Sequence, residues 1–494
     1  MKKKNSFGIR MFQILVFSLI FFSLSCQNQV DPVMDIGFLE TAYEKYQEQS
    51  VQTRRFKYGE VIHLVKDRKG DFLVEEIGKS VEGKAIYQMN IGNGPIKILL
   101  WSQMHGNEST ATMALFDLFN FFEGENDGMD EVRNKLKEKL NIRFIPMLNP
   151  DGMDQWMRRN ALDIDLNRDA ASLTSPEAVI LKNARDSFEP DFGFNLHDQN
   201  IYYTAGETPT PATISVLAPA YNFETEVNDI RKRAIQVIVG MNRLIQEAAP
   251  GHVGKYDDAF EPRAFGDNIQ KWGTSTILIE SGGYPNDPEK QYIRKLNFMI
   301  ILHALIEIAD SSYTNYSLDD YYAIPDNATR LMDVMIRNLP MQKGDLTYNI
   351  DLGIRQREVD AHGSYFVNGG IEDLGDLSIF YGYEELDASG MEIIEGKIYE
   401  NAFEKPVDIT PEKALELLRE GFLAVKVEEA EERELYDLPI LVLRNSGAIP
   451  FGIRTGGSPN FYLAKDGELK YALVNGYLIN LESPKKTDFK QRVL

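Results

Sequence analysis

The stretch that decides the fold is residues 97–122, KILLWSQMHGNESTATMALFDLFNFF. Its first half is an apolar run typical of a buried strand. Its second half has apolar residues at helical spacing, with Ser109 or Thr110 placed to cap the first turn. Between the two halves, His105 and Glu108 stand three residues apart, where an open α/β sheet usually holds its active site. These two side chains could share a divalent metal, so the rest of the chain must supply a third ligand and a base.

The composition is that of an ordinary globular protein, and 494 residues are too many for one compact core. We therefore expect more than one domain. The formal net charge is −22 and the isoelectric point is near 4.8. This acidic balance argues against a nucleic-acid partner, because little basic surface is available to meet phosphates.

Residues 1–25 have the pattern of an export signal. A basic start is followed by an apolar segment that is too short to span a membrane comfortably. Cys26, the only cysteine, comes next, and the whole segment resembles the signal of a bacterial lipoprotein, in which this cysteine is lipidated. We expect an exported protein, anchored by lipid to the membrane of a bacterial cell envelope. The alternatives are a plain secretory signal, giving a periplasmic or secreted protein, and an uncleaved anchor.

Beyond a tether at residues 26–37, segments with helical and strand patterns alternate as far as residue 314. We expect helices at 38–56, 110–122, 131–140, 226–248 and 290–309, and strands at 61–91, 96–102, 142–147, 190–196 and 274–279. The patterns also predict tight turns at Glu82-Gly83 and at 149–152, NPDG. This alternation predicts an α/β catalytic domain at 38–314, with a mixed open sheet and helices on both faces.

From residue 318 onwards the sequence favours strands. We expect two smaller β-rich domains, at 318–405 and 406–494, the second with a helical insert at 411–420 that begins at Thr410-Pro411. Asp466-Gly467 lies between two strand-like runs and predicts a hairpin turn.

Two later strands also end in polar groups that carry chemistry. His197 follows the run PDFGFNL at 190–196, and Glu280 follows TSTILI at 274–279. The carboxyl ends of parallel strands lie along one edge of a sheet, so His105, Glu108, His197 and Glu280 could converge. Residues 158–168, RRNALDIDLNR, add a dense group of side chains that bind carboxylates or orient ligands.

Taken together, these motifs resemble the zinc carboxypeptidase family typified by carboxypeptidase A. The motifs are His-x-x-Glu, Asn-Pro-Asp-Gly, Arg-x-Asn followed by Asp-x-Asn-Arg, a strand-end His and a strand-end Glu, in the family's order over residues 40–310. The resemblance implies one Zn²⁺ per chain, with Glu280 as general base and the metal ligands His105, Glu108 and His197.

The resemblance also assigns roles within residues 158–168. It implies that Arg158 polarises the scissile carbonyl, with Arg159 as the alternative for that role. It further implies that Asp165 orients the first histidine ligand, and that Asn167 and Arg168 grip the terminal carboxylate of the substrate. The planar fork of an arginine suits that last task, because it can pair with both oxygens of a carboxylate.

The chemistry fits these assignments. Two histidines and one glutamate leave an open fourth position on a tetrahedral zinc. Zinc lowers the pKa of a bound water towards about 7, and a nearby carboxylate can complete its deprotonation.

Three features depart from the family pattern. Asp169 follows Asn167-Arg168, and the spacing of 89 residues from Glu108 to His197 indicates a shortened loop. The family's mobile tyrosine has no clear counterpart, although Tyr256 lies somewhat upstream of the expected point. Asp267 and Ile269 lie near the expected side-chain pocket without settling its preference.

The sequence therefore predicts an exported zinc metallocarboxypeptidase that removes C-terminal residues from peptides. One alternative is a zinc amidohydrolase acting on cell-wall peptides or on another amide. The other is a catalytically inactive envelope binding protein on the same fold, against which the presence of Glu280 argues.

Overall fold

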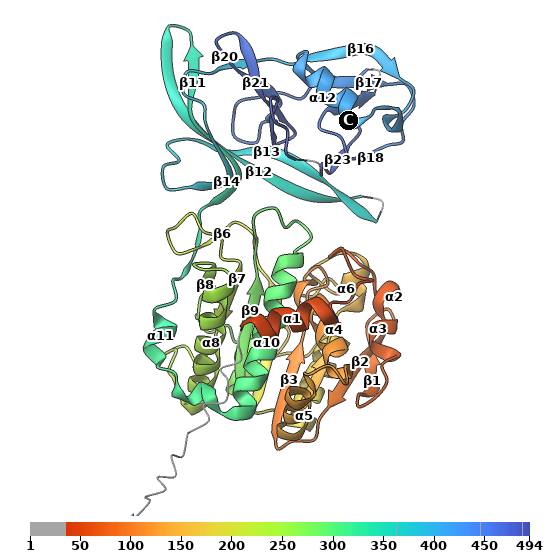
Figure 1. Ribbon diagram of the computed structural model, residues 1–494, viewed down its shortest axis with the longest axis vertical. Coiled ribbons are helices and arrows are strands. Elements are labelled where there is room, and N and C mark those ends of the chain that lie inside the picture. The colour runs from red at the N-terminus through yellow and green to blue at the C-terminus, as the bar shows by residue number, and fades with distance from the viewer. Residues whose placement is uncertain (1–35, 362, 445, 487) are drawn as a thin grey trace, which may run out of the picture. The chain divides into compact units, whose positions relative to one another are not determined.

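The computed structural model describes residues 36–494 except 362, 445 and 487 (Figure 1). The leader expected at 1–25, Cys26, and the tether up to residue 35 lie outside the described residues. Within the described part of the chain, no helix has the length and apolar character needed to cross a membrane.

An eight-stranded mixed sheet forms the first part of the described chain. Across the sheet, its strands are β1 (Leu73–Lys79), β2 (Ala85–Ile91), β4 (Leu140–Ile145), β3 (Ile96–Trp101), β5 (Phe192–Asp198), β9 (Ser275–Ser281), β7 (Ile214–Leu217) and β8 (Val253–Lys255). The central pairs β4–β3, β3–β5 and β5–β9 are parallel, whereas β1–β2, β2–β4 and β7–β9 are antiparallel. The predicted mixed open sheet is confirmed.

Helices cover both faces of this sheet, as predicted. One layer contains α4 (Thr110–Glu123), α8 (Asp229–Ala248) and α10 (Gln291–Asp310), with α1 (Ile36–Tyr46) and α5 (Asp130–Lys139) against α10 (Figure 1). The other contains α7 (Pro176–Phe188) and α9 (Phe265–Lys271), whose apolar residues share a core with Leu99 and Trp101. Ile98 and Leu100 are equally buried and alternate with them along β3, as side chains of a strand covered on both faces must.

Three local predictions are wrong. The run at 61–65 forms parts of two short helices, α2 (Tyr58–Val61) and α3 (His63–Lys66), where a strand was expected. α1 ends at residue 46, well short of residue 56. The expected turn at 149–152 is the start of helix α6 (Pro150–Asp154), where the Asn149 side chain accepts the Gly152 N–H and caps the helix. The hairpin at Glu82-Gly83 is confirmed, and Gly83 has φ +84°.

The chain after α10 passes through the short helices η2 (Ser312–Asn315) and α11 (Leu318–Tyr322), and α11 still contacts α8. β10 (Asn327–Thr329) then pairs with β6 (Tyr203–Ala205), which lies shortly after β5 in the chain. The boundary expected between residues 314 and 318 stays a prediction.

The remaining residues are rich in strands, as predicted. They form four sheets: β13 (Ser364–Gly375), β12 (Leu346–Ala361), β11 (Leu331–Lys343) and β14 (Tyr381–Asp387); β15 (Glu392–Ile394), β20 (Phe461–Lys465), β21 (Glu468–Val474) and β22 (Tyr477–Asn480); β16 (Lys397–Phe403), β17 (Phe422–Val427) and β19 (Leu441–Arg444); and β18 (Leu435–Tyr436) with β23 (Gln491–Arg492).

Two of these sheets combine strands from both sides of η3 (Pro406–Asp408). The division at residue 406 therefore coincides with no sheet boundary, and it stays a prediction. The helical insert is α12 (Pro411–Arg419), capped by Thr410, and the hairpin turn at Asp466-Gly467 has the two positive φ angles expected of it.

Candidate metal centre and active site

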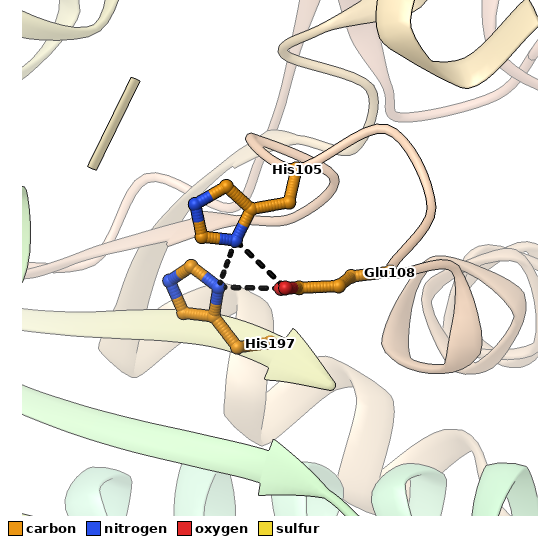
Figure 2. A group of neighbouring side chains, drawn as sticks. All are labelled: His105, Glu108 and His197. Atoms are coloured by element: carbon orange, nitrogen blue, oxygen red, sulfur yellow. Dashed lines mark hydrogen bonds and ion pairs between the residues drawn. The ribbon is translucent and has the colours of Figure 1, made fainter. Parts of the chain in front are cut away.

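Figure 2 shows His105, Glu108 and His197 facing one another. His105 and Glu108 come from the loop between β3 and α4, and His197 is on β5, the parallel neighbour of β3. Glu108 lies with one oxygen 2.8 Å from His105 Nδ1 and the other 2.7 Å from His197 Nδ1. All three side chains are buried, and one ligand atom from each lies within 4.8 Å of the others. The structure thus brings together the three residues expected to hold the metal.

The donor atoms of this cluster fit a cation. His105 Nε2 donates to Asp165 Oδ1 at 3.0 Å, so a neutral His105 ring carries its lone pair on Nδ1. That lone pair faces the Glu108 carboxylate and, at 3.1 Å, His197 Nδ1. Electron-pair donors that converge in this way repel one another unless a proton or a metal lies between them. Two imidazoles and one carboxylate are a donor set that zinc prefers.

The electrostatics of the cluster keep two of the ligands, Glu108 and His197, in their binding forms. Burial opposes ionisation of Glu108, but the two imidazoles hold its pKa below the usual value. Burial lowers the pKa of His197, which favours the neutral ring that a metal needs.

The ligand loop needs glycine for a reason that the sequence did not reveal. Gly106 lies against the backbone of α6, and a Cβ at this position would overlap with the Gly152 carbonyl carbon. Gln103, in the same loop, has φ +46°, and its side-chain amide donates to the Gly106 carbonyl at 3.1 Å. The expected capping of α4 is wrong in detail: Ser109 Oγ donates to the Arg54 carbonyl, and Thr110 Oγ1 donates to Asp198.

Glu280 lies beside the cluster on β9. Its backbone is in parallel register with His197, so the two side chains emerge on the same face of the sheet. Burial, together with the negative charges of Glu108 and Asp198, raises the pKa of Glu280 well above its usual value. A carboxyl group with a strongly raised pKa beside candidate metal ligands has the properties of a general acid or base.

Of the two neighbouring arginines, Arg158 is the one that reaches the cluster. Its Nη1 lies 3.1 Å from Glu108 Oε1, and its Nε donates to Asp165 Oδ2 at 3.0 Å. Arg159 instead donates to the Asp163 carbonyl at 2.7 Å. Asp165 therefore contacts both Arg158 and His105, and these contacts hold its pKa below the usual value although burial opposes this.

Asn167 and Arg168 lie in the short helix η1 (Leu166–Arg168), directly after Asp165. Asn167 Oδ1 accepts the Phe265 N–H at 2.9 Å, and Arg168 Nε forms an ion pair with Glu261 Oε2 at 3.3 Å. Asn167 thus contacts the first residue of α9, Arg168 contacts the segment before α9, and Arg168 remains 39% exposed.

Sequence reasoning missed the ion pair that supports the end of β5. Lys290 is buried, and its Nζ donates to Asp198 Oδ2 at 2.9 Å and to the Ser281 carbonyl at 3.0 Å. The Asp198 N–H in turn donates to Glu108 Oε2 at 3.2 Å. An aspartate next to the strand-end histidine was the available signal, but nothing in the sequence identified its lysine partner.

Tyr256 is the tyrosine that the structure places near the site. It follows β8, its ring packs edge-on against Tyr203, and burial and the nearby Glu280 charge both raise its pKa. Among the other residues noted from the sequence, Asp267 Oδ1 accepts the Glu261 N–H and Ile269 belongs to the core beneath α9.

Comparison with known proteins gives a consistent result. Residues 59–213 match the family model for zinc carboxypeptidases. An uncharacterized protein of Zymomonas mobilis is 32% identical over 127 residues, which are 25% of this chain and 33% of that protein. A probable carboxypeptidase 2 of Trichophyton verrucosum is 27% identical over 161 residues, 32% of this chain and 28% of that protein.

Among solved structures, a metallo-carboxypeptidase from Burkholderia cenocepacia is 18% identical, with a TM-score of 0.44, over 52% of this chain and 70% of that one. The chain spans about a third or less of the length of the two curated relatives.

An open mixed sheet that brings two histidines and a glutamate together at one edge has the arrangement expected of a metal-dependent hydrolase site. The family match makes this resemblance more specific. Residues 59–213 of the chain are similar to the zinc carboxypeptidase family.

Proposed function

We propose that this protein is a zinc-dependent metallocarboxypeptidase that removes C-terminal residues from peptides. The observation that carries the proposal is the convergence of His105, Glu108 and His197 with Glu280 on the adjacent strand. The match of residues 59–213 to the zinc carboxypeptidase family model supports the choice of metal and of reaction.

Each group has a defined part in this reaction. When bound by the two histidines and Glu108, zinc supplies Lewis-acid chemistry that favours attack of water on a carbonyl. Glu280 removes a proton from the attacking water and returns it to the leaving amine. Arg158, already within hydrogen-bond distance of Glu108, stabilises the negative charge that develops on the carbonyl oxygen.

Arg168 gives the proposed enzyme its preference for a chain end. Arg168 is the last residue of the short helix η1, which Asp165 caps. Its guanidinium is partly exposed, so a terminal carboxylate can reach it. A charge-assisted pair of this kind contributes about 1.5–3 kcal/mol, which corresponds to roughly 10- to 150-fold in binding.

The test is mass spectrometry of mixed peptides, with free or amidated C-termini, after digestion by the zinc-loaded protein. We expect single residues to be released from free C-termini, with loss of activity on chelation and recovery with zinc. Arg168→Gln should raise KM for free C-termini about 10-fold or more. Arg159→Gln, which alters an exposed arginine that contacts the Asp163 carbonyl, is the matched control and should leave KM unchanged.

One observation favours a second candidate. Because Glu261 already pairs with Arg168, the natural substrate could be an amide that carries no free carboxylate, such as a cell-wall amide. Turnover of blocked substrates that is unaffected by Arg168→Gln, together with unchanged activity on free C-termini, would support this candidate. Absence of any chelator-sensitive hydrolysis would instead support a binding protein.

We also propose that the protein is exported and held at the bacterial envelope through lipid on Cys26. The basic and apolar pattern of residues 1–25 supports this proposal. Cys26→Ala should move the protein from the detergent phase to the aqueous phase in a detergent-partition assay, and an unchanged distribution would contradict lipidation.

A further inference from the structure

The arginine proposed to grip the substrate already has an acidic partner from its own chain. Glu261 Oε2 lies 3.3 Å from Arg168 Nε and 2.9 Å from Arg263 Nη2. The other Glu261 oxygen accepts from Arg263 Nε at 3.0 Å. The Glu261 carboxylate therefore lies between two guanidinium groups. It pairs with Arg263 through both of its oxygens and with Arg168 through Oε2 alone.

Contacts with η1 hold Glu261 in this place. The Phe265 N–H donates to Asn167 Oδ1 of η1 at 2.9 Å, and the N–H of Ala170, two residues after η1, donates to the Arg263 carbonyl at 3.1 Å. Glu261 itself is fixed through its N–H, which donates to Asp267 Oδ1 at 2.9 Å. These hydrogen bonds position the segment before α9 so that the Glu261 side chain lies beside Arg168.

Glu261 occupies part of the edge that a substrate carboxylate needs. Arginine pairs with a carboxylate through two parallel N–H groups. On Arg168, Nη1 donates to the Asn167 carbonyl at 2.7 Å, so the edge formed by Nε and Nη2 remains for bidentate binding. Glu261 lies at the Nε end of that edge. A substrate carboxylate that binds there must displace Glu261 from Nε and is also repelled by its negative charge.

We propose that Glu261 is a specificity-determining residue that competes with the substrate's terminal carboxylate for Arg168. Before substrate binds, it pairs with both arginines. When a terminal carboxylate takes the Nε and Nη2 edge, Glu261 releases Arg168 and keeps its bidentate pair with Arg263. This inference rests on the proposed carboxypeptidase function and adds to it an internal competitor that weakens the binding of every substrate with a free carboxylate.

The first experiment compares the zinc-loaded wild type with Glu261→Gln on peptides with free C-termini. Because the competing pair is partly exposed, we expect KM to fall about two- to fivefold, with a smaller change in kcat. Raising the salt concentration from about 50 mM to about 500 mM should shrink the difference, since salt screens a partly exposed pair. A KM that is unchanged or raised in Glu261→Gln would overturn the inference.

Arg263→Gln gives the opposite expectation. Removing the alternative partner leaves Glu261 with Arg168 alone, so KM should rise, and a fall in KM would contradict the competition. Asp163→Asn is the charge-matched control, because it removes an exposed acid that pairs with Arg159, and its KM should equal that of the wild type.

The two proposals can fail separately. If Arg168→Gln raises KM but Glu261→Gln does not lower it, Arg168 binds the terminal carboxylate and Glu261 does not compete for it. If Arg168→Gln has no effect, terminal-carboxylate recognition itself is wrong.

Discussion

Glu280 illustrates how a single residue acquires its chemistry from its surroundings. It is a buried carboxyl group, and the acids Glu108 and Asp198 raise its pKa further. We predict that Glu280→Gln retains zinc but loses activity by about 10²- to 10⁴-fold in kcat, because the amide cannot accept a proton. Metal content by mass spectrometry and kcat should be measured on the same sample. Glu108→Gln should lose both metal and activity, and a fully active Glu280→Gln would remove Glu280 from the mechanism.

Asp267 gives a prediction for stability as a function of pH. Burial raises its pKa to about 7, so the folded protein binds its proton more tightly than the unfolded chain does. The stabilisation by that proton is complete below the unfolded pKa of about 3.9 and is lost as the pH rises through about 7. Asp267→Asn keeps the oxygen that accepts the Glu261 N–H and cannot ionise.

In urea denaturation, Asp267→Asn should therefore equal the wild type near pH 4 and be more stable near pH 8, by at most about 4 kcal/mol. Equal stabilities at both pH values would show that the carboxyl group of Asp267 is solvated like that of a surface aspartate.

At the scale of single residues, the sequence predicts the convergence of His105, Glu108 and His197 well and the residues around them poorly. His105, His197 and Glu280 each follow an apolar run, so the end of a strand marks their position along the chain. Glu261 and Lys290 have no such mark, because charged residues are common in loops and at helix starts. Their roles depend on partners 93 and 92 residues away in the chain, Arg168 and Asp198, which only the folded structure identifies.

The element that most constrains the site is the loop between β3 and α4. Gly106 lies in contact with the backbone of α6, and both sides of that contact are main chain, so neither can move aside easily. We predict that Gly106→Ala displaces the ligand loop, costs about 1–3 kcal/mol of stability, and weakens zinc binding.

Gly59→Ala is the matched control for this variant. Gly59 is in the short helix α2, and a Cβ there meets no atom within 4 Å, so alanine should leave stability unchanged or slightly higher. Zinc titration and thermal unfolding of both variants test the prediction, and a Gly106→Ala protein with unchanged zinc affinity would contradict it.

At the scale of elements, long apolar patterns predict well and short ones do not. The central strands β3, β4, β5 and β9 and the helices α4, α5, α8 and α10 lie within a few residues of their expected bounds, because burial on both faces of a sheet requires continuous apolar runs. By contrast, α1 ends ten residues before its expected end, and α7 was not expected at all. The five residues at 61–65 have a short apolar pattern that predicts a strand, but local helix signals decide the outcome there: the Glu60 carboxylate accepts the Lys57 N–H and supports the first turn of α2.

Over the whole molecule, contacts link the strand-rich residues to the ligand loop. Arg54 and Arg55 form ion pairs with Glu358, and Arg55 also stacks on Tyr365 with its guanidinium 4.2 Å from the ring centre. The Arg54 carbonyl accepts the hydroxyl of Ser109, the residue next to Glu108. None of these links is visible in the sequence, because each joins segments about 55 or about 300 residues apart.

A second set of contacts involves the segment that follows His197. Tyr202 donates to Asp333 at 2.6 Å, Tyr383 donates to the Ile201 carbonyl at 2.5 Å, and β10 pairs with β6. Separating these segments would leave buried polar groups without partners, which is costly. The strand-rich residues are therefore part of the support of the site, although the family model matches only residues 59–213.

We predict that residues 36–494 unfold in one cooperative transition because of these links. Zinc that binds only the folded state raises the free energy of unfolding by about 2.7 kcal/mol at 100 times its dissociation constant, so removing it should lower the midpoint temperature of that single transition. Differential scanning calorimetry with and without a chelator measures this. If the strand-rich residues fold independently, two transitions will appear, and the chelator will shift only the one that contains the His105, Glu108 and His197 cluster, since a metal can stabilise only the unit that binds it.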